Sequence, residues 1–335
     1  MTSDSRMEIF STCPPSAGVP PDLYMAHLTQ VARWSEEAGC TGMLVYSDNS
    51  VLDPWLISHI IIQRTTTLCP LVAVQPVYMH PYWVAKQIAS LAYVHGRRIY
   101  LNMVAGGFKN DLDALNDATP HDQRYARLIE YTTIVMGLLT SRTPFTYEGE
   151  FHRVTRLRLA PALPESLVPE VFVSGSSDAG IAAAKSLRAT AIKYPKPASE
   201  EDHPPGAGAP GSLGIRVGII ARREEAEAWE VARARFPEDR QGQLTRQLAS
   251  KVSDSVWHHQ LSELDPAEKS PYWLVPFQNY KTMCPYLVGS YEQVAVELAR
   301  YFHAGYRRVI LDIPPSAEEL RHTLEAFDGA LQPVR

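Results

Sequence analysis

The sequence predicts a closed (β/α)8 barrel, the TIM-barrel class, with insertions after the fourth strand and between the seventh and eighth strands. Short apolar segments alternate with amphipathic segments along the whole chain, and eight of the apolar segments have strand character. A doubly wound sheet is the rival architecture, but it favours a G-x-G-x-x-G turn after an early strand, and no such turn follows one here. The 335 residues allow one or two domains, and because barrels reach this size as one unit, we expect a single domain over residues 1–335.

The predicted strands are short and apolar, as expected of strands that are buried on both faces. They cover Met7–Phe10, Gly42–Tyr46, Leu68–Val74, Ile99–Val104, Val171–Ser174, Thr190–Tyr194, Ile215–Ala221 and Arg308–Asp312.

The predicted helices carry recognisable start and stop signals. Asp53 is placed to cap a helix that has Pro54 at its first position, and Gly39 and Gly96 follow the last apolar positions of two other helices. The helices cover Leu23–Ala38, Pro54–Arg64, Pro81–Val94, Arg124–Leu139, Asp178–Leu187, Glu224–Phe236, Gln243–Leu261, Tyr291–Ala304 and Ala317–Leu331.

Three further segments interrupt this alternation. Residues 108–121 are polar and predict an irregular segment, and residues 143–158 predict a small hairpin around Gly149. The segment Pro195–Gly214 is rich in proline and glycine, which predicts a mobile loop.

Composition excludes several classes of function. The net charge is −5 and no block of basic residues is present, so the sequence lacks the positive surface that binds nucleic acid. No apolar run is long enough to span a membrane. The polar N-terminus is not a signal peptide, and the four cysteines form no C-x-x-C pair. We therefore expect a soluble cytoplasmic protein with reduced thiols, no metal site and no nucleic-acid or membrane partner.

In a barrel of this class the chemistry lies on loops at the carboxyl ends of the strands. Ser174–Asp178 joins a strand to a helix through small residues, which suits either an anion at the helix N-terminus or an ordinary capped turn. Asn102 lies at the end of an apolar strand, where it is either a structural amide or a ligand contact. Arg216 lies at the start of the seventh strand, where it either is solvated or faces a ligand. His80 is a further pocket candidate, because it follows the third strand.

The chain resembles the bacterial luciferase-like flavin monooxygenases, specifically the alkanesulfonate monooxygenase branch, from about residue 7 to residue 330. The order and spacing of ten stretches carry the resemblance. They are Ala38–Gly42, Asp53–Trp55, Leu71–Pro76, Val84–Leu91, Leu101–Gly106, Arg124–Tyr125, Tyr147–Gly149, Ser174–Asp178, Ile215–Val217 and Val288–Ser290.

The resemblance implies a site for reduced FMN. Its phosphate would contact Gly175, Ser176 and Ser177 together with Tyr125, and Asn102 would meet the edge of the flavin ring. 

Further ring contacts follow from the same resemblance. Ala73 and Val74 would form a bulge under the ring, often with a non-proline cis peptide, and Ala105 would complete the cofactor site. The segment Pro271–Leu287 matches a flexible loop from which Tyr280 or Lys281 would reach inward.

Several positions depart from the alkanesulfonate enzymes. Val51 replaces a cysteine, Gly218 replaces a histidine and Tyr194 replaces a tryptophan. Ile313–Pro315 replaces an aromatic-histidine segment, and the helix after the sixth strand is largely replaced by Pro195–Gly214. The flavin half of the site is therefore kept, whereas the substrate half is rewritten.

The implied function is a two-component monooxygenase that uses reduced FMN and O2, through a peroxyflavin, to oxidise a small organic or biosynthetic substrate that is not clearly a sulfonate. Asn102 and Arg216 would act near the flavin, and Tyr194 or His80 would touch the substrate. The implied partners are an NAD(P)H-dependent flavin reductase and further copies of the chain in a homodimer or homotetramer. The alternatives are a deazaflavin-dependent hydride transferase, a flavin-binding protein without turnover, and a flavin-free barrel lyase or isomerase.

Overall fold

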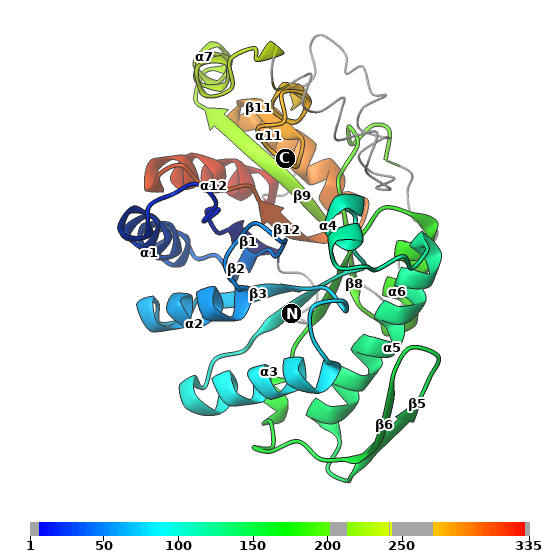
Figure 1. Ribbon diagram of the computed structural model, residues 1–335. Helices are drawn as coiled ribbons and strands as arrows, with labels where there is room; N and C mark the ends of the chain where they lie inside the picture. The colour runs from blue at the N-terminus through cyan, green and yellow to red at the C-terminus, as the bar shows by residue number, and fades with distance from the viewer. Residues whose placement is uncertain (1–6, 202–212, 241, 243–270, 332–335) are drawn as a thin grey trace.

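The computed structural model describes residues 7–201, 213–240, 242 and 271–331. Eight parallel strands close into a barrel with helices around it (Figure 1), which confirms the predicted fold class. Neighbouring strands follow the order β9-β12-β1-β2-β3-β4-β7-β8, and β8 pairs with β9 to close the ring. The barrel strands are β1 (Glu8–Thr12), β2 (Gly42–Val45), β3 (Cys69–Val74), β4 (Tyr100–Val104), β7 (Val171–Ser174), β8 (Thr190–Lys193), β9 (Leu213–Arg222) and β12 (Tyr306–Leu311).

The outer helices begin and end at the predicted caps. Asp53 accepts hydrogen bonds from the backbone nitrogens of Trp55 and Leu56 at the start of α2. Gly96 ends α3 in the left-handed conformation with φ 62°, where the absence of a Cβ avoids a steric clash. The longer helices are α1 (Pro21–Glu37), α2 (Pro54–Arg64), α3 (Pro81–His95), α5 (His121–Thr140), α6 (Asp178–Leu187), α7 (Glu225–Arg235), α11 (Tyr291–His303) and α12 (Ala317–Leu331).

The insertion after β4 is more regular than predicted. Residues 109–114 form the helix α4 (Lys109–Ala114), which buries Leu112 under an otherwise polar surface. A single buried side chain gives too weak a periodicity for a helix to be predicted. The predicted hairpin is confirmed as β5 (Phe145–Glu148) and β6 (Arg153–Leu157), and a short 3-10 helix, η2 (Glu165–Leu167), follows it.

The prediction of a mobile loop after β8 is wrong for its first residues. The Tyr272 hydroxyl donates a hydrogen bond to the carbonyl oxygen of Pro195 at 2.7 Å. The backbone nitrogen of Ala198 donates to the carboxylate of Glu297 at 2.8 Å. Buried side chains from distant segments therefore form hydrogen bonds with backbone groups of this loop. Residues 202–212 and the helix predicted over 243–261 lie outside the described residues.

The segment predicted as a flexible loop before residue 287 is packed. It contains β10 (Tyr272–Trp273) and α10 (Val275–Gln278), and it leads into β11 (Tyr286–Ser290). The second half of β9 pairs with β11, which runs parallel to it, and Tyr286 lies opposite Gly218. Long-range pairing with β9, rather than local periodicity, orders this segment.

The interior of the barrel is filled by one apolar layer. Its members lie on successive strands, and edge-to-face contacts join Phe10 to Tyr100 and Phe172, with ring centroids 5.1 and 5.3 Å apart. The layer comprises Phe10, Leu44, Leu71, Tyr100, Phe172, Ile192 and Ile310. Every member is at most 4% exposed, so the barrel has a packed floor rather than a pore.

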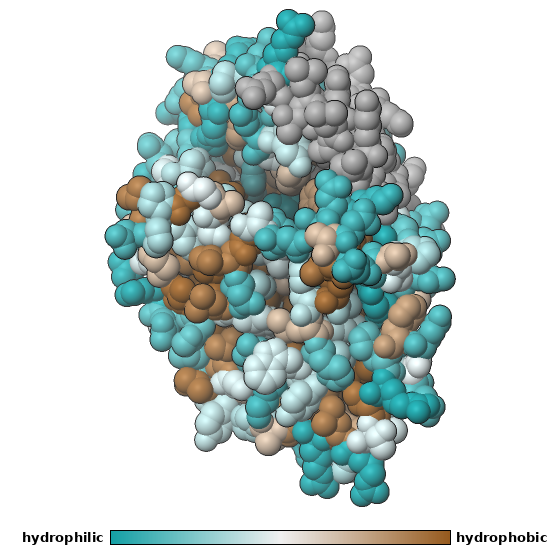
Figure 2. All heavy atoms as spheres, viewed as in Figure 1, coloured by the Kyte–Doolittle hydropathy of each residue, from teal (hydrophilic) through white to brown (hydrophobic). Residues whose placement is uncertain are grey.

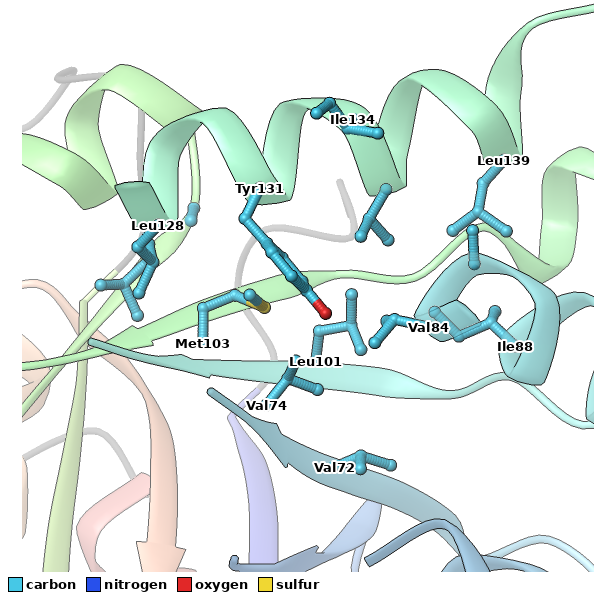
Figure 3. Packing of buried hydrophobic residues seen from close by; sticks show 14 of the residues in the cluster. Val72, Val74, Val84, Ile88, Leu101, Met103, Leu128, Tyr131, Ile134 and Leu139 are labelled. Atoms are coloured by element: carbon cyan, nitrogen blue, oxygen red, sulfur yellow. The ribbon is translucent and has the colours of Figure 1, made fainter. Parts of the chain in front are cut away.

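A second core lies between the barrel wall and the helices (Figure 3). Val72 and Val74 on β3 and Leu101 and Met103 on β4 alternate with the interior residues and face outward toward α3 and α5. Tyr131 enters this core from α5, and its hydroxyl donates to the carbonyl oxygen of Met79 at 2.9 Å. Both faces of these strands are therefore buried, which explains their apolar sequences.

The described surface is mixed in character. Figure 2 shows hydrophilic side chains over most of the viewed face and an apolar cluster near α2. Leu52 precedes α2 and is 45% exposed, and Leu56 in the first turn of α2 is 51% exposed. Within the described residues, no helix is both long and apolar enough to cross a membrane.

Candidate active site

The carboxyl end of the barrel carries polar side chains directly above the apolar floor. Strand alternation places the residue two positions after each floor residue on the same inward face. On β9 the floor position is Gly214, which pairs with Ile192. Counted in this way, the inward residues of this layer are Thr12, Tyr46, Ala73, Asn102, Ser174, Tyr194, Arg216 and Asp312. A polar layer on a closed apolar floor is where a barrel of this class holds a ligand.

Asn102 is held in one orientation in this layer. It is 5% exposed, and its Oδ1 accepts a hydrogen bond of 2.7 Å from the Ser174 hydroxyl on β7. This bond occupies the amide oxygen and leaves the amide nitrogen as a donor. The structure therefore brings the predicted residue to the site as an oriented hydrogen-bond donor.

Ala73 and Val74 lie on β3 in regular register. Ala73 pairs with Asn102 and faces inward, whereas Val74 pairs with Met103 and packs in the outer core. The expected bulge and cis peptide at this point are wrong, because the ladder is unbroken and the one cis bond of the described chain is Ala160–Pro161. Only Ala73 of the two therefore presents its side chain to the barrel interior.

The turn from β7 to α6 forms a cradle at a helix N-terminus. Ser177 caps α6 by accepting from the backbone nitrogen of Gly180 at 3.1 Å. A Cβ on Gly175 would lie 2.3 Å from the Tyr125 hydroxyl, so only glycine permits this approach. The Ser176 hydroxyl is buried and has no hydrogen-bond partner among the described residues. An unused donor beside a capped helix N-terminus is suited to an anion.

Tyr125 closes one side of the cradle from α5. It is 8% exposed; burial raises its pKa, although a hydrogen bond with Ser177 works in the opposite direction. The neighbouring Arg124 is 4% exposed and donates to the carbonyl oxygen of Thr119 at 3.0 Å. The predicted group of Gly175, Ser176, Ser177 and Tyr125 is thus brought together.

A half-buried ion pair fixes the segment that leads into α5. Arg127 donates to Asp117 at 2.6 and 3.1 Å, and the Thr119 hydroxyl donates to the same carboxylate at 2.5 Å. Burial alone would raise the pKa of Asp117, but the hydrogen bonds from Arg127 and Thr119 lower it to about 2. The pair therefore stays charged and holds the start of α5 beside the cradle.

Arg216 lies on β9, and Tyr194 directly follows β8, on the arc of the barrel that begins next to the cradle strand β7. Arg216 faces the barrel interior, and its Nε is buried without a hydrogen-bond partner among the described residues. Burial alone would lower its pKa, but Tyr194 and the carboxylate of Asp312 favour the charged form and raise the pKa above its ordinary value. A buried guanidinium with an unused donor has the chemistry of an anion or carbonyl contact.

Two residues of this side were missed from the sequence. The Tyr286 hydroxyl donates to Oδ2 of Asp312 at 2.7 Å. A Cβ on Gly218 would lie 2.2 to 2.5 Å from the ring of Tyr286, so glycine makes room for that ring on β9. Asp312 could have been found from its place two residues after the apolar Ile310, whereas Tyr286 depends on the long-range pairing of β11.

The thiols near the mouth are not nucleophiles. Burial raises the pKa of Cys13 to about 12, and it also raises the pKa of Cys284 well above the ordinary value. Both therefore remain protonated at neutral pH. Within the described residues, no group of three or more His, Cys, Asp and Glu side chains is arranged to hold a metal ion.

Other predicted residues lie apart from the polar layer. His80 is exposed, and its Nδ1 caps α3 by accepting from the backbone nitrogen of Tyr82 at 3.2 Å. Ala105 is 5% exposed and belongs to the outer core with Tyr125. Lys281 does not reach inward, because it forms an ion pair of 2.6 Å with Asp239.

Tyr280 differs from its neighbour Lys281. It adopts φ 55°, an uncommon conformation for a residue other than glycine, and burial together with the nearby Asp48 carboxylate raises its pKa. Asp48 follows β2 at the mouth, so Tyr280 is the residue of this segment that approaches the site.

Comparison with known proteins identifies the family. The family model described as luciferase-like monooxygenase matches residues 7–308. The chain is 33% identical over 318 residues to the 4-(gamma-L-glutamylamino)butanoyl-[BtrI acyl-carrier protein] monooxygenase BtrO of Niallia circulans, covering 93% of each protein.

Solved structures share the fold at low identity. Long-chain alkane monooxygenase (LadA) has a TM-score of 0.73 at 15% identity, covering 100% of this chain and 94% of that one. EDTA monooxygenase (EmoA) from Chelativorans sp. BNC1 has a TM-score of 0.70 at 16% identity, covering 98% and 95%. These matches do not single out the alkanesulfonate branch. The chain belongs to the luciferase-like monooxygenase family and is a flavin-dependent monooxygenase.

Proposed function

We propose that this chain is the oxygenase of a two-component system, which takes reduced FMN from a separate NAD(P)H-dependent reductase and uses O2 to oxidise an organic biosynthetic substrate. The observation that carries the proposal is the cradle at the N-terminus of α6, where the buried Ser176 hydroxyl lacks a partner among the described residues. Reduced flavin, when bound, supplies the two electrons that O2 activation requires.

The residues of the cradle fit a phosphate. The Ser176 hydroxyl and the free amides of the first turn of α6 are donors, and the helix N-terminus favours negative charge. Gly175 lets the backbone approach the Tyr125 hydroxyl closely, and Arg124 adds a buried positive charge on the adjoining turn of α5. These donors would hold the phosphate of FMN.

The ring end of the cofactor would lie over β3 and β4. Ala73 is small and faces inward, which leaves room for a flat ring, and the oriented amide of Asn102 offers a donor to its edge. The packed floor beneath them excludes water from below. A dry site matters because stray water and protons divert the electrons to hydrogen peroxide.

The substrate would occupy the side of the mouth formed by β8, β9 and β12. Arg216 and Tyr194 supply polar contacts there, and the charged guanidinium of Arg216 would donate hydrogen bonds to an oxygen of the substrate. By similarity to the Niallia circulans relative, whose name gives an acyl group on a carrier protein, we propose an acyl thioester as the substrate class. We further propose a homodimer or homotetramer.

Anaerobic titration with reduced FMN tests the cofactor assignment. Ser176→Ala removes one hydrogen bond to a charged group, so we expect Kd to rise about 10- to 100-fold. Ser166→Ala, at an exposed serine, is the matched control and should leave Kd unchanged. Oxygen uptake with reduced FMN and an acyl thioester then tests the reaction.

Two outcomes would contradict the proposal. Tight binding of a deazaflavin, with hydride transfer and no oxygen uptake, would show a hydride transferase. Flavin binding with oxygen uptake no faster than that of free reduced FMN, across a panel of acyl thioesters, would show a binding protein without turnover.

A further inference from the structure

Two opposite charges face the barrel mouth from neighbouring strands without pairing. Arg216 on β9 is in register with Ile310 on β12, and Asp312 lies two residues further toward the mouth. No ion pair of 4 Å or less joins their side chains, although each lies within the electrostatic range of the other. Because no direct ion pair joins these two opposite charges, each keeps hydrogen-bonding capacity for a ligand at the mouth.

The positive charge is incompletely satisfied. Arg216 Nε is buried and has no hydrogen-bond partner among the described residues, and Tyr194 lies beside the guanidinium. Burial of a charged donor without a partner costs free energy unless a ligand supplies the acceptor. A carboxylate is the acceptor whose two oxygens match a guanidinium best.

The negative charge is held in place by a tyrosine. Tyr286 donates to Oδ2 of Asp312, and its ring is fixed against Gly218, where a Cβ would overlap it. The structure gives Oδ1 of Asp312 no hydrogen-bond partner in the part of the chain that it describes. A fixed carboxylate with one oxygen engaged and one available is suited to an ammonium donor.

We propose that Arg216 and Asp312 together recognise a dipolar end group of the substrate, with its carboxylate at Arg216 and its ammonium at Asp312, as in a free α-amino acid. A purely anionic end would meet the repulsion of Asp312, and a purely cationic end that of Arg216, so the pair selects against both. This inference rests on the proposed function, because it names the substrate class of the same site.

The chemistry of the relative agrees with this reading. The γ-L-glutamylamino group in its name is attached through the side-chain carboxyl, so it keeps the free amine and the free carboxylate of an α-amino acid. A molecule with this end group therefore serves as a probe for the two inward charges of this chain.

The test measures binding without turnover. The probes are 4-(γ-L-glutamylamino)butanoate, its N-acetyl form, which lacks the ammonium, and its α-carboxamide, which lacks that carboxylate. Isothermal titration calorimetry follows each probe with the full-length protein, both alone and saturated with oxidised FMN. The wild-type protein should bind the dipolar probe about tenfold or more tightly than either neutralised form.

Two variants should separate the charges. Asp312→Asn should lose the preference for the ammonium and keep the preference for the carboxylate, whereas Arg216→Gln should show the reverse. Asp328→Asn, an exposed carboxylate on α12, is the matched control and should keep both preferences. The thermal unfolding midpoint of each variant shows that it folds.

The results can also overturn the proposal. Equal binding of all three probes to the wild-type protein would exclude dipolar recognition, as would no measurable binding to protein that still binds FMN. Retention of the ammonium preference by folded Asp312→Asn would exclude the assigned carboxylate. If the wild-type protein does not bind FMN but still prefers the dipolar probe, the proposed function is contradicted and dipolar recognition is not.

Discussion

The contact between Gly218 and Tyr286 predicts a measurable cost for the substitution of one methyl group. In Gly218→Ala the new Cβ would lie 2.2 to 2.5 Å from three atoms of the Tyr286 ring, well inside van der Waals contact. The ring is 4% exposed and its hydroxyl is engaged by Asp312, so it cannot move aside freely. Overpacking of this kind costs about 1–3 kcal/mol.

The cost can be converted into a shift of the melting temperature. An unfolding entropy of about 2.1 cal/mol/K per residue over 335 residues makes 1 kcal/mol equivalent to about 1.5 °C. We therefore expect differential scanning calorimetry to show Tm lowered by about 1.5–4 °C. The FMN Kd should stay within about twofold, because the cradle lies on β7 and α6 rather than on β9.

A double-mutant cycle isolates the contact. In a Tyr286→Leu background the ring is absent, so the added methyl group of Gly218→Ala should cost almost nothing. If Gly218→Ala lowers Tm equally in both backgrounds, or leaves the wild-type Tm unchanged, then the ring does not lie over Gly218 and the reasoning fails.

Three shorter predictions concern other parts of the chain. Asp117→Asn should lower the free energy of unfolding by about 2 kcal/mol at pH 7, because Arg127 depresses the native pKa of Asp117 to about 2. In the wild-type protein this contribution is present above about pH 4 and is lost as the pH falls toward 2. Urea unfolding of both proteins at pH 7 and pH 3 would measure it. A similar loss for the variant at both pH values would refute it. A thiol reagent at pH 8 should react in the native state with Cys69 alone, because the other three thiols are buried, and with all four thiols after unfolding; rapid native labelling of a second thiol would contradict this. Ser174→Ala should free the amide of Asn102 and weaken reduced-FMN binding by about 1 kcal/mol in an anaerobic titration; an unchanged Kd would show that the hydrogen bond does not orient a flavin contact.

Local signals predicted the barrel well. The eight strands were found because each is a short apolar run, and the helix starts were found because caps such as Asp53 act through bonds within three residues. The polar segment at 109–114 was missed because α4 buries one side chain. Strand β11 was missed because its order depends on pairing with a strand more than 60 residues earlier, between Tyr286 and Gly218, which no local pattern records.

The site was predicted less evenly than the fold. Gly175 to Ser177 occupy one turn, so their sequence already places them together at a helix N-terminus. Asp312 has no such neighbour, since its partner Tyr286 lies 26 residues away on a strand outside the barrel. His80 caps α3 apart from the polar layer, because position after a strand does not distinguish an inward residue from a helix cap.

The order of the strands explains how one barrel can keep its cofactor site while its substrate site changes. The residues proposed for the flavin lie on β3, β4 and β7, which are adjacent in the barrel, and those proposed for the substrate lie on β8, β9 and β12, which form the next three strands of the ring. Each strand contributes one inward position to this layer. A substitution at Gly218 on β9 therefore alters the mouth beside β11 and leaves the pairing of β4 with β7 unchanged. The tyrosine that fills the space above Gly218 arrives on β11, from outside the eight-stranded ring. On the proposed placement of the substrate, specificity would be set partly by an insertion, which can vary in length and sequence without disturbing the closure of the barrel.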